Sequence, residues 1–468
     1  MKTLDQIFLT LLGIISFACQ PKEVPSKGPI TWRLTTADQS VLFNTQSAIS
    51  FQSDLALINA ITVDTTQRFQ TVDGFGYTLT GGSAQLINAL SDSLKDTLLR
   101  ELFTTEGDGI GISFIRISIG ASDLDDHVFS YNDMPKGKTD VELKNFSLAE
   151  DEKNLIPILK KIVALNPNIK IMGSPWSAPA WMKTNGSPKG GSLKKEYYAA
   201  YAQYFVKYIQ TMQNQGILLH SITIQNEPEN PKNMPSMVMT ATEQSDFIKN
   251  HLGPAFEKND LKTKILLFDH NCDHPEYPIQ ILNDSLTRQY VDGSAFHMYL
   301  GDVSAMGKVH DTHADKNIYF TEQWTSGDGD FGGDLKWHVD HLMIGATRHW
   351  SKTVLEWNLA ADPQFNPHTN DGGCDRCLGA LTIGNTITRN VAYYIVAHAS
   401  KFIRPGAVRI GSNMTDDLPN VAFQNTDGSK VLLVLNASQS SRNFSISCKQ
   451  QSARASLPAG AVATYHWK

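Results

Sequence analysis

The 468-residue sequence has no excess of basic residues, since 41 Lys and Arg stand against 47 Asp and Glu, a formal net charge of −6. This balance argues against nucleic acid as a main partner. Five cysteines are too few for a disulfide scaffold. No apolar run reaches the roughly 20 residues that a membrane-spanning helix needs. With 41% hydrophobic and 19% charged residues, the composition indicates a globular enzyme or binding protein.

The N-terminus carries a short apolar run, IFLTLLGIISFA at 7–18, which suits the apolar region of a secretory signal. Small residues precede Cys19, and the pattern resembles a bacterial lipoprotein signal, in which Cys19 would be lipidated and become the mature N-terminus. Plain secretion with cleavage near Ala18 is the alternative. We expect a signal peptide at 1–19, a tether at 20–30, and an exported protein at the periplasm or cell surface.

The middle of the chain alternates short apolar runs with amphipathic stretches. Eight strand-plus-helix units predict an α/β fold, a (β/α)8 TIM barrel, with a doubly wound sheet as the structural rival. The eight runs are 71–79, 112–119, 169–176, 221–227, 264–270, 294–300, 318–324 and 353–359.

The last part of the chain changes to short strands separated by Asn, Asp, Gly and Ser, which indicates a small antiparallel β-sandwich. Segments 31–36 and 55–64 also have strand character and cannot belong to the barrel. We therefore expect N-terminal strands within 31–66 to join the sandwich. The barrel is predicted at 67–402 and the remaining sandwich strands at 403–468.

Two carboxylic acids, Glu227 and Glu322, stand near the C-terminal ends of the predicted fourth and seventh strands. That end of a TIM barrel is where active-site side chains project, and these two strands lie roughly opposite each other. Aromatic and hydrogen-bonding side chains stand beside these acids and at the ends of five other strands, as sugar recognition requires. They are Arg116, Asp123, Trp176, Asn226, Asp269, His270, His297, Tyr299, Trp324, Trp357 and Asn358.

This combination suits glycoside hydrolysis. One carboxyl group must be protonated to donate to the leaving oxygen, and the other must be ionised to attack the anomeric carbon or to activate water. A non-catalytic carbohydrate-binding protein is the rival from another class, and it is disfavoured because both glutamates are present.

Other patterns point elsewhere only weakly. GDGDFG at 327–332 fits a dinucleotide-binding template but lacks the surrounding βαβ unit, so we interpret it as an active-site loop. The His and Cys pairs lack a second ligand pair at recognisable spacing, and we predict no metal. Cys374 and Cys377 could form a tight disulfide in an exported protein. A single CxxC motif is weak evidence for zinc.

Five segments resemble glycoside hydrolase family 30, the glucosylceramidase-like family that includes bacterial β-1,6-glucanases. The resemblance covers nearly the whole chain from about residue 55 onward. The segments are SPWSAPAWMKTNG (174–186), QNEP (225–228), YLGD (299–302), FTEQW (320–324) and EWNLA (356–360).

The resemblance implies retaining double displacement. Glu227 would be the acid/base, protonated at the start, and Glu322 the ionised nucleophile. Arg116 would order the carboxylates, and Tyr299 would hydrogen-bond the nucleophile. The remaining implied contacts are to the sugar: Asn226 to its 2-hydroxyl, Asp123, Trp176 and Trp357 to a terminal glucose, and His297 and Asp269 in supporting or subsite roles.

The resemblance also bounds the substrate. It implies a carbohydrate or glycolipid substrate with β-linked glucose and no cofactor. From the N-terminal signal pattern, we expect membrane contact only through a lipid on Cys19. A glucosylceramidase-like β-glucosidase is the first interpretation, with an endo- or exo-β-1,6-glucanase of the same family as the alternative.

Overall fold

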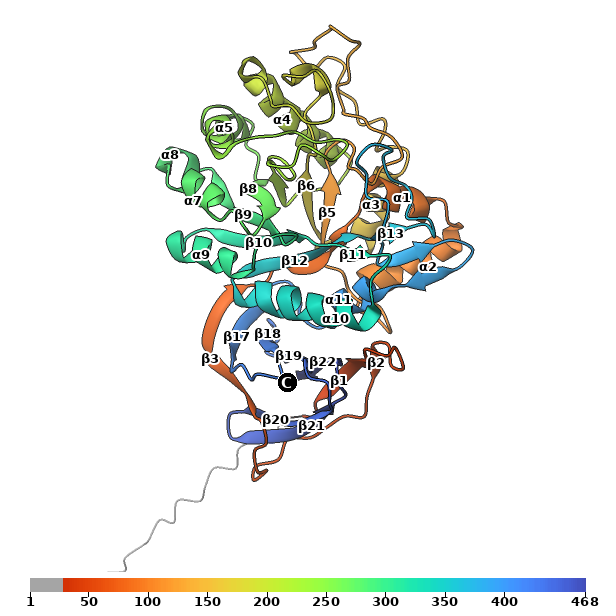
Figure 1. Ribbon diagram of the computed structural model, residues 1–468, viewed down its shortest axis with the longest axis vertical. Helices are drawn as coiled ribbons and strands as arrows, with labels where there is room; N and C mark the ends of the chain where they lie inside the picture. Colours follow the sequence, from red (N-terminus) through yellow and green to blue (C-terminus); the bar gives the residue numbers. More distant parts are fainter. Residues whose placement is uncertain (1–27) are drawn as a thin grey trace, which may run out of the picture.

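The computed structural model describes residues 28–468, which form a barrel above a β-sheet domain (Figure 1). The predicted signal peptide, Cys19 and nearly all of the predicted tether lie outside the described residues. Within the described part, every helix is too short or too polar to cross a bilayer.

Eight parallel strands close into a barrel in the order β10-β12-β4-β5-β6-β7-β8-β9. Each contains part of one predicted apolar run, so the (β/α)8 prediction is confirmed. The barrel strands are β4 Gly74–Thr78, β5 Phe114–Ser118, β6 Lys170–Ser174, β7 Ser221–Thr223, β8 Lys264–Asn271, β9 Val291–His297, β10 Asn317–Glu322 and β12 Ser351–Asn358.

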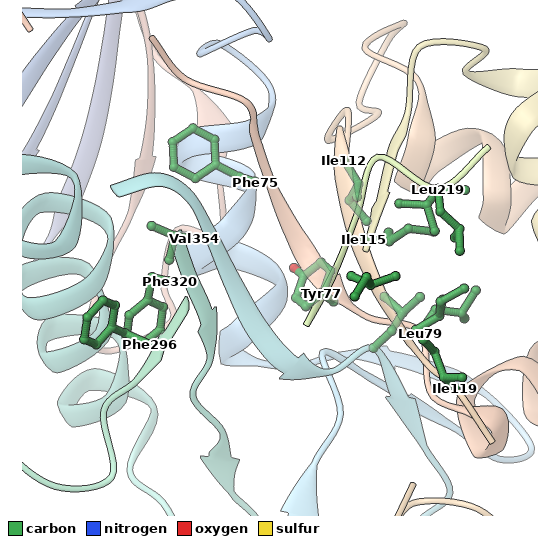
Figure 2. Packing of buried hydrophobic residues seen from close by; sticks show 14 of the residues in the cluster. Phe75, Tyr77, Leu79, Ile112, Ile115, Ile119, Leu219, Phe296, Phe320 and Val354 are labelled. Carbon is green, nitrogen blue, oxygen red and sulfur yellow. The ribbon is translucent and has the colours of Figure 1, made fainter. Parts of the chain in front are cut away.

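Helices surround the barrel and cover its outer face. Figure 2 shows Phe75, Ile115, Phe296, Phe320 and Val354 among the buried side chains of this layer. The helices are α1 Gly81–Asn88, α2 Asp92–Phe103, α3 Leu155–Leu165, α4 Tyr198–Asn214, α5 Ala241–Phe247, α6 Gly253–Lys258, α7 Glu276–Leu282, α8 Ser285–Arg288, α9 Ser304–Thr312, α10 Phe331–His338 and α11 Val391–Ser400, with short 3₁₀ turns at Ala180–Met182 and Lys195–Tyr197 and π-helical turns at Ile248–Leu252 and Val339–Ala346.

The inside of the barrel is filled by a separate apolar layer. Side chains alternate between the two faces of a strand, so the next inward position lies two residues further along. After Phe114 that position is Arg116, and after Ala295 it is His297. The floor of the site is therefore apolar and its next layer is polar. The apolar layer consists of Phe114, Met172, Leu266, Ala295, Tyr319 and Leu355.

Short strands also occur in the long loops at the mouth of the barrel. β11 pairs with β14, and β15 pairs with both β13 and β16. These strands are β11 Thr325–Ser326, β13 Ala360–Ala361, β14 Cys377–Leu378, β15 Leu381–Ile383 and β16 Ile387–Arg389.

The second domain is a curled nine-stranded sheet in the order β2-β1-β22-β19-β18-β17-β3-β20-β21, below the barrel in Figure 1. Its pairings are antiparallel except for the parallel contact of β3 with β20. N-terminal strands join it, as predicted. The strands are β1 Thr31–Thr35, β2 Asn44–Thr45, β3 Ile61–Thr71, β17 Val408–Ser412, β18 Asn420–Gln424, β19 Lys430–Leu435, β20 Arg442–Cys448, β21 Gln451–Leu457 and β22 Val462–Trp467.

Two details of this sheet differ from the sequence interpretation. The strand expected at 55–64 begins only at Ile61, because Asn59 has a φ of 41° and interrupts extended backbone before it. The edge strand β21 was not predicted, since QSARASL has small and polar residues rather than the β-branched and aromatic ones typical of strands.

Candidate active site

Arg116 lies at the centre of the polar layer and is fully buried. Its Nη1 donates to Glu322 Oε2 at 2.6 Å. Its Nη2 donates to Asn226 Oδ1 at 2.6 Å, to Asp269 Oδ2 at 2.8 Å and to Ser174 Oγ at 3.1 Å. One guanidinium thus fixes residues from four other strands or strand ends, which only a planar, multidentate cation can do.

Irregular pairing turns two of these carboxylates inward. The register of β10 shifts between Phe320 and Glu322, and that of β8 shifts between Phe268 and His270. A bulge of this kind re-aims a side chain, so Glu322 and Asp269 point into the barrel instead of following strict alternation. Asp269 has a φ of 61°, within the left-handed region.

Glu227 follows the end of β7 and has a φ of 46°, a strained conformation for a glutamate. The backbone N–H of Glu227 donates to Asp269 O at 3.0 Å, and this hydrogen bond stabilises the strained backbone conformation. Its Oε2 accepts from Asn230 Nδ2 at 2.7 Å and from Asn233 Nδ2 at 3.3 Å. The carboxyl group is buried but open to the cavity described below.

His297 joins the three acids of the site. Its Nε2 lies 3.1 Å from Asp269 Oδ1, and its Nδ1 lies 3.4 Å from Glu227 Oε1 and 3.6 Å from Glu322 Oε1. One atom each of Glu227, Glu322 and His297 all lie within 4.8 Å of one another. This is close to the separation of about 5–5.5 Å between the carboxyl groups of retaining glycosidases.

A cavity of about 220 Å³ opens over the two glutamates. Its volume is below the roughly 300 Å³ lower end of drug-sized sites, which suits one sugar unit. Beside it, Trp176 stacks on Trp357 with ring centroids 5.3 Å apart. Tyr299 Oη donates to Glu322 Oε1 at 3.0 Å. The lining consists of Asp123, Glu227, Asn230, Asn233, Tyr299, Glu322, Trp324, Trp357, Cys374 and Cys377.

The charges of the two glutamates differ from the sequence-based expectation. Burial raises the pKa of Glu322, although His297 and Arg116 oppose the rise. Burial also raises the pKa of Glu227, but the hydrogen bond and charge of His297 more than offset it, so this pKa lies below its usual value. These two directions are the reverse of those that a protonated Glu227 and an ionised Glu322 would have in the free site.

The pKa of His297 shifts in the opposite direction to that of Glu227. Burial lowers the pKa of this imidazole, but the charges of Glu322 and Asp269 and its hydrogen bonds outweigh burial and raise the pKa to about 9. Burial also raises the pKa of Asp123 to about 8, with the like charges of Glu322 and Glu227 adding to the rise. At neutral pH the site thus has His297 as a cation and Asp123 as a neutral acid.

Both domains match one family. The description "Glycosyl hydrolase family 30 TIM-barrel domain" matches residues 72–403, and "Glycosyl hydrolase family 30 beta sandwich domain" matches residues 406–465. The chain belongs to glycosyl hydrolase family 30. It is therefore a retaining glycosidase that acts on carbohydrate.

Relatives of this family 30 enzyme include an endo-1,6-β-D-glucanase of Aspergillus fumigatus, 36% identical over 80% of this chain and 81% of the relative. The lysosomal acid glucosylceramidase of Mus musculus is 28% identical over 87% and 83% of the two chains. The solved structure of the endo-β1,6-glucanase BT3312 is 33% identical, covers 94% of this chain and 99% of its own, and superposes with a TM-score of 0.87.

The family 30 site brings together the catalytic and sugar-binding residues that the resemblance implied. Arg116, Asn226, Asp269 and His297 form its buried network, and Trp176 packs behind Trp357. The others line the cavity: Asp123, Glu227, Tyr299, Glu322 and Trp357. Of the other strand-end residues named from the sequence, Trp324 also lines the cavity, whereas His270 and Asn358 do not, and Asn358 Oδ1 accepts from Ser83 Oγ at 2.9 Å.

Sequence reasoning missed Asn230 and Asn233, which lie in the loop NEPENPKN and resemble ordinary turn residues. Their position three and six residues after Glu227 is the one available signal. It also missed Thr321, whose Oγ1 donates to Asp269 Oδ1 at 2.7 Å. Threonine is common in strands, so nothing in the sequence distinguishes this one.

Glu227, Glu322 and His297 also offer donor atoms that could hold a divalent metal ion. Double displacement by two carboxyl groups needs no such ion. The predicted Cys374–Cys377 disulfide is present in the structure and lies in the wall of the cavity.

Proposed function

We propose that this family 30 enzyme hydrolyses β-linked glucosyl units of a glucan, above all a β-1,6-glucan. The observation that carries the proposal is the approach of Glu227 and Glu322 to within 4.8 Å at the base of one cavity. That spacing leaves room for one anomeric carbon between the two carboxyl groups but no water between carboxylate and sugar.

Glu322 Oε forms a bond to the anomeric carbon while the glycosidic C–O bond breaks and Glu227 gives a proton to the leaving oxygen. In the second step Glu227 removes a proton from water, the water oxygen bonds to the anomeric carbon, and Glu322 leaves as a carboxylate. Arg116 stabilises the ionised Glu322 at 2.6 Å. Asn230 and Asn233 stabilise the ionised Glu227 before and after proton transfer.

The proton that Glu227 donates resides on His297 before substrate binds. His297 Nδ1 lies 3.4 Å from Glu227 Oε1, so the proton crosses one hydrogen bond. Transfer converts an imidazolium–carboxylate pair into a neutral imidazole and a carboxylic acid, with no change in the net charge of the site. Substrate that displaces water from the cavity favours the neutral pair, because a low dielectric disfavours separated charges.

The surroundings of the cavity favour a glucan over a glycolipid. Three carboxyl groups and two amides line it, as hydroxyl recognition requires. Of the large, exposed apolar side chains among residues 28–468, Leu300 is the one next to a lining residue, Tyr299. One leucine provides little surface for a ceramide. Glucosylceramide is the second candidate, supported by the likeness to the glucosylceramidase of Mus musculus.

The first experiment compares glucose and oligosaccharide release from a β-1,6-glucan and from glucosylceramide in detergent. Faster turnover of the β-1,6-glucan would support a glucan as the substrate. Turnover of glucosylceramide alone would show that glucosylceramide is the substrate instead. An enzyme inert on both, and on an aryl β-glucoside, would contradict the proposal.

A second experiment assigns the two roles. Glu322→Gln should abolish hydrolysis of an aryl β-glucoside, because no nucleophile remains. Glu227→Ala should keep activity on aglycones that leave without protonation, and added azide should raise it and yield the β-glucosyl azide. If azide instead rescued a Glu322→Ala variant, with inverted product, the roles would be exchanged.

The N-terminal pattern supports a further proposal, that the enzyme is exported and anchored through a lipid on Cys19. The apolar run at 7–18 followed by small residues and Cys19 is its basis. Cells that express the full chain and are fed labelled palmitate should yield a labelled, detergent-soluble enzyme, and Cys19→Ala should yield an unlabelled one. Label that persists in Cys19→Ala would refute the anchor.

A further inference from the structure

The loop between β12 and α11 crosses the mouth of the barrel, and we call its residues 362–380 the arch. One end of the arch rests on the loop that follows β10. There β14 pairs with β11, with Cys377 opposite Ser326, and Gly327 N donates to Arg376 O at 2.9 Å. Trp324, a lining residue of the cavity, directly precedes β11.

The other end of the arch rests on the loops of three further strands. Thr369 N donates to Asp123 O at 2.9 Å, and Thr369 Oγ1 donates to Met234 O at 2.7 Å. Lys189 Nζ pairs with Asp371 Oδ1 at 2.7 Å. The arch thus connects the loops after β5, β6 and β7 with the loop after β10, on opposite sides of the cavity.

Two glycines let the arch pass close to its supports. A Cβ on Gly373 would lie 2.4 Å from Thr369 O and 2.8 Å from Asp123 O. Gly372 has a φ of +92°, and a Cβ there would lie 2.4 Å from Lys232 O. Side chains at these positions would push the arch away from the cavity.

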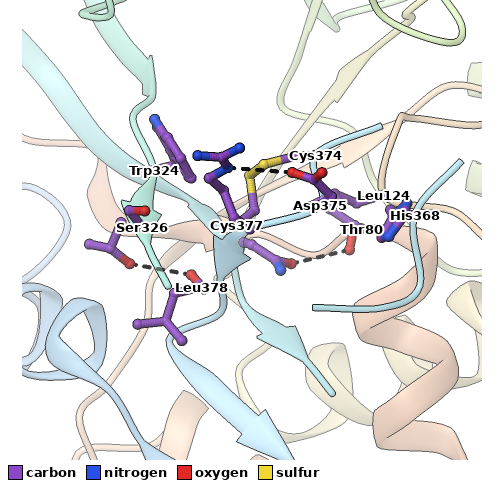
Figure 3. The surroundings of a disulfide bond; sticks show 12 residues. Thr80, Leu124, Trp324, Ser326, His368, Cys374, Asp375, Cys377 and Leu378 are labelled. Atoms are coloured by element: carbon purple, nitrogen blue, oxygen red, sulfur yellow. Dashed lines mark hydrogen bonds and ion pairs between the residues drawn. A yellow bond between two sulfur atoms is a disulfide. The ribbon is translucent and has the colours of Figure 1, made fainter. Parts of the chain in front are cut away.

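The disulfide lies where the arch faces the cavity. Cys374 and Cys377 both line it, together with Trp324 and Trp357. Cys377 is 3% exposed and belongs to a small apolar cluster with Leu124, Trp176 and Trp357, with Trp324 and Cys374 packed at its edge. Figure 3 shows the disulfide beside Trp324 and close to β14.

We propose that the Cys374–Cys377 disulfide is a sugar-binding wall of the active site, held in place by the arch. This inference rests on the proposed function, and it assigns to the disulfide the binding of the glucosyl unit and not the cleavage of its bond. Sulfur and indole present apolar, polarisable surface to the C–H groups of the sugar. The cross-link keeps a four-residue turn closed against the cavity, which open thiols would not.

The test replaces both cysteines by serine. Cys374→Ser with Cys377→Ser should raise KM for an aryl β-glucoside about fivefold to tenfold and leave kcat within about twofold, since the wall contacts substrate and transition state alike. Dithiothreitol should raise the KM of the wild type similarly and leave the double variant unchanged. Cys272 and Cys448 are buried and take no part in this disulfide.

Two further variants make the result specific. Lys189→Ala weakens the far support of the arch with the disulfide intact, and should raise KM in the same direction. Asp375→Ala is the matched control, because Asp375 lies between the cysteines, is exposed, and pairs with Arg376 outside the cavity lining. It should leave KM unchanged.

The inference would be overturned by an unchanged KM in a folded double variant, or by a fall in kcat with KM unaltered. If the wild type proved inert on β-glucosides, the proposed function would fail, but the wall would still be tested. Calorimetry with a glucose-configured iminosugar then compares the Kd of wild type and double variant. Equal Kd values would refute the wall, and a several-fold weaker Kd in the variant would support it.

Discussion

At the scale of single residues, the site consists of buried basic and acidic side chains that shift each other's pKa values. Arg116 and His297 are cations at neutral pH, and Asp269 and Glu322 are held beside them. Burial acts to raise the pKa of Asp269, but Arg116 and His297 reverse this and hold it well below its usual value. Asp269 is therefore held as a carboxylate beside the two cations.

Arg116→Lys should lower kcat/KM by about 10²–10³-fold, because one ammonium cannot make the four contacts of the guanidinium. The measurement is steady-state kinetics on an aryl β-glucoside, with circular dichroism to verify folding. Arg442→Lys is the control, since its partner Asp417 lies on the sheet domain. A folded Arg116→Lys enzyme with wild-type kcat would contradict this role.

His297→Gln should narrow the pH profile of kcat/KM from both sides. In the wild type the imidazolium, whose pKa of about 9 is set against burial by the charge of Glu322, retains the transferable proton up to that pH. Without it, the proton must reside on the Glu227 carboxyl group itself. The loss of His297 raises the pKa of Glu227, because His297 no longer offsets burial, but we expect the basic limb of this carboxylic acid to fall below that of the imidazolium. The acidic limb rises, because Glu322 loses a cation that favours its ionised form.

The control for this profile is His274→Gln, since His274 is exposed and pairs with Glu229 outside the catalytic network. Its profile should match that of the wild type. A His297→Gln profile with the basic limb still near pH 9 would mean that His297 holds no catalytic proton.

At the scale of elements, strand periodicity and its interruptions decide which side chains enter the site. Regular alternation places Arg116, two residues after Phe114, on the same inward face of β5. Shifts in the pairing register of β8 and β10 turn Asp269 and Glu322 inward although strict alternation would not. The helices that follow the strands begin at local signals of their own, as the capping box of α5 shows.

The N-terminus of α5 offers a test of how much such a local signal stabilises the fold. Thr240 Oγ1 accepts from Glu243 N, and the Glu243 carboxylate accepts from Thr240 N at 2.8 Å, a complete capping box. Thr240→Ala should lower the free energy of unfolding by about 1 kcal/mol, because an N-terminal N–H loses its partner. Urea denaturation measures this change.

Thr240 is in the loop region between Glu227 and α5 but does not line the catalytic cavity. The variant should therefore keep the wild-type kcat and KM. Thr242→Ala, two residues later in the first turn of the same helix, is the matched control and should change stability much less. Equal loss in both variants would show that the cap itself contributes nothing.

At the scale of the whole molecule, the barrel and the sheet domain share a buried polar contact. His398 of α11 has Nδ1 2.9 Å from Thr464 Oγ1 of β22 and Nε2 2.9 Å from Thr35 Oγ1 of β1. Phe43 packs against the ring with centroids 4.9 Å apart. The first and last strands of the described chain are thereby joined to the last barrel helix.

This contact predicts acid sensitivity of the fold. Burial lowers the pKa of His398 to about 3, so the unfolded chain binds a proton below about pH 6.5 that the folded protein excludes. The contribution of His398 to the free energy of unfolding is complete above pH 6.5. It falls by up to about 1.4 kcal/mol per pH unit as the pH drops toward 3. His398→Gln should remove this part of the slope, measured by urea denaturation at several pH values. An unchanged slope in the variant would contradict it.

The sequence by itself determined the barrel and the two glutamates, because alternating apolar runs and motifs such as QNEP are local signals that survive without coordinates. It also identified the sheet domain, except for the two-residue strand β2 and for β21, whose small and polar residues lack a strand signal.

Only the tertiary structure decided which groups shift the pKa values of the two glutamates and which side chains line the cavity. The charge of Glu227 depends on His297, 70 residues away along the chain, and the disulfide meets the cavity because the arch rests on distant loops. Electrostatic energy and packing depend on separation in space, and separation along the chain does not reveal it.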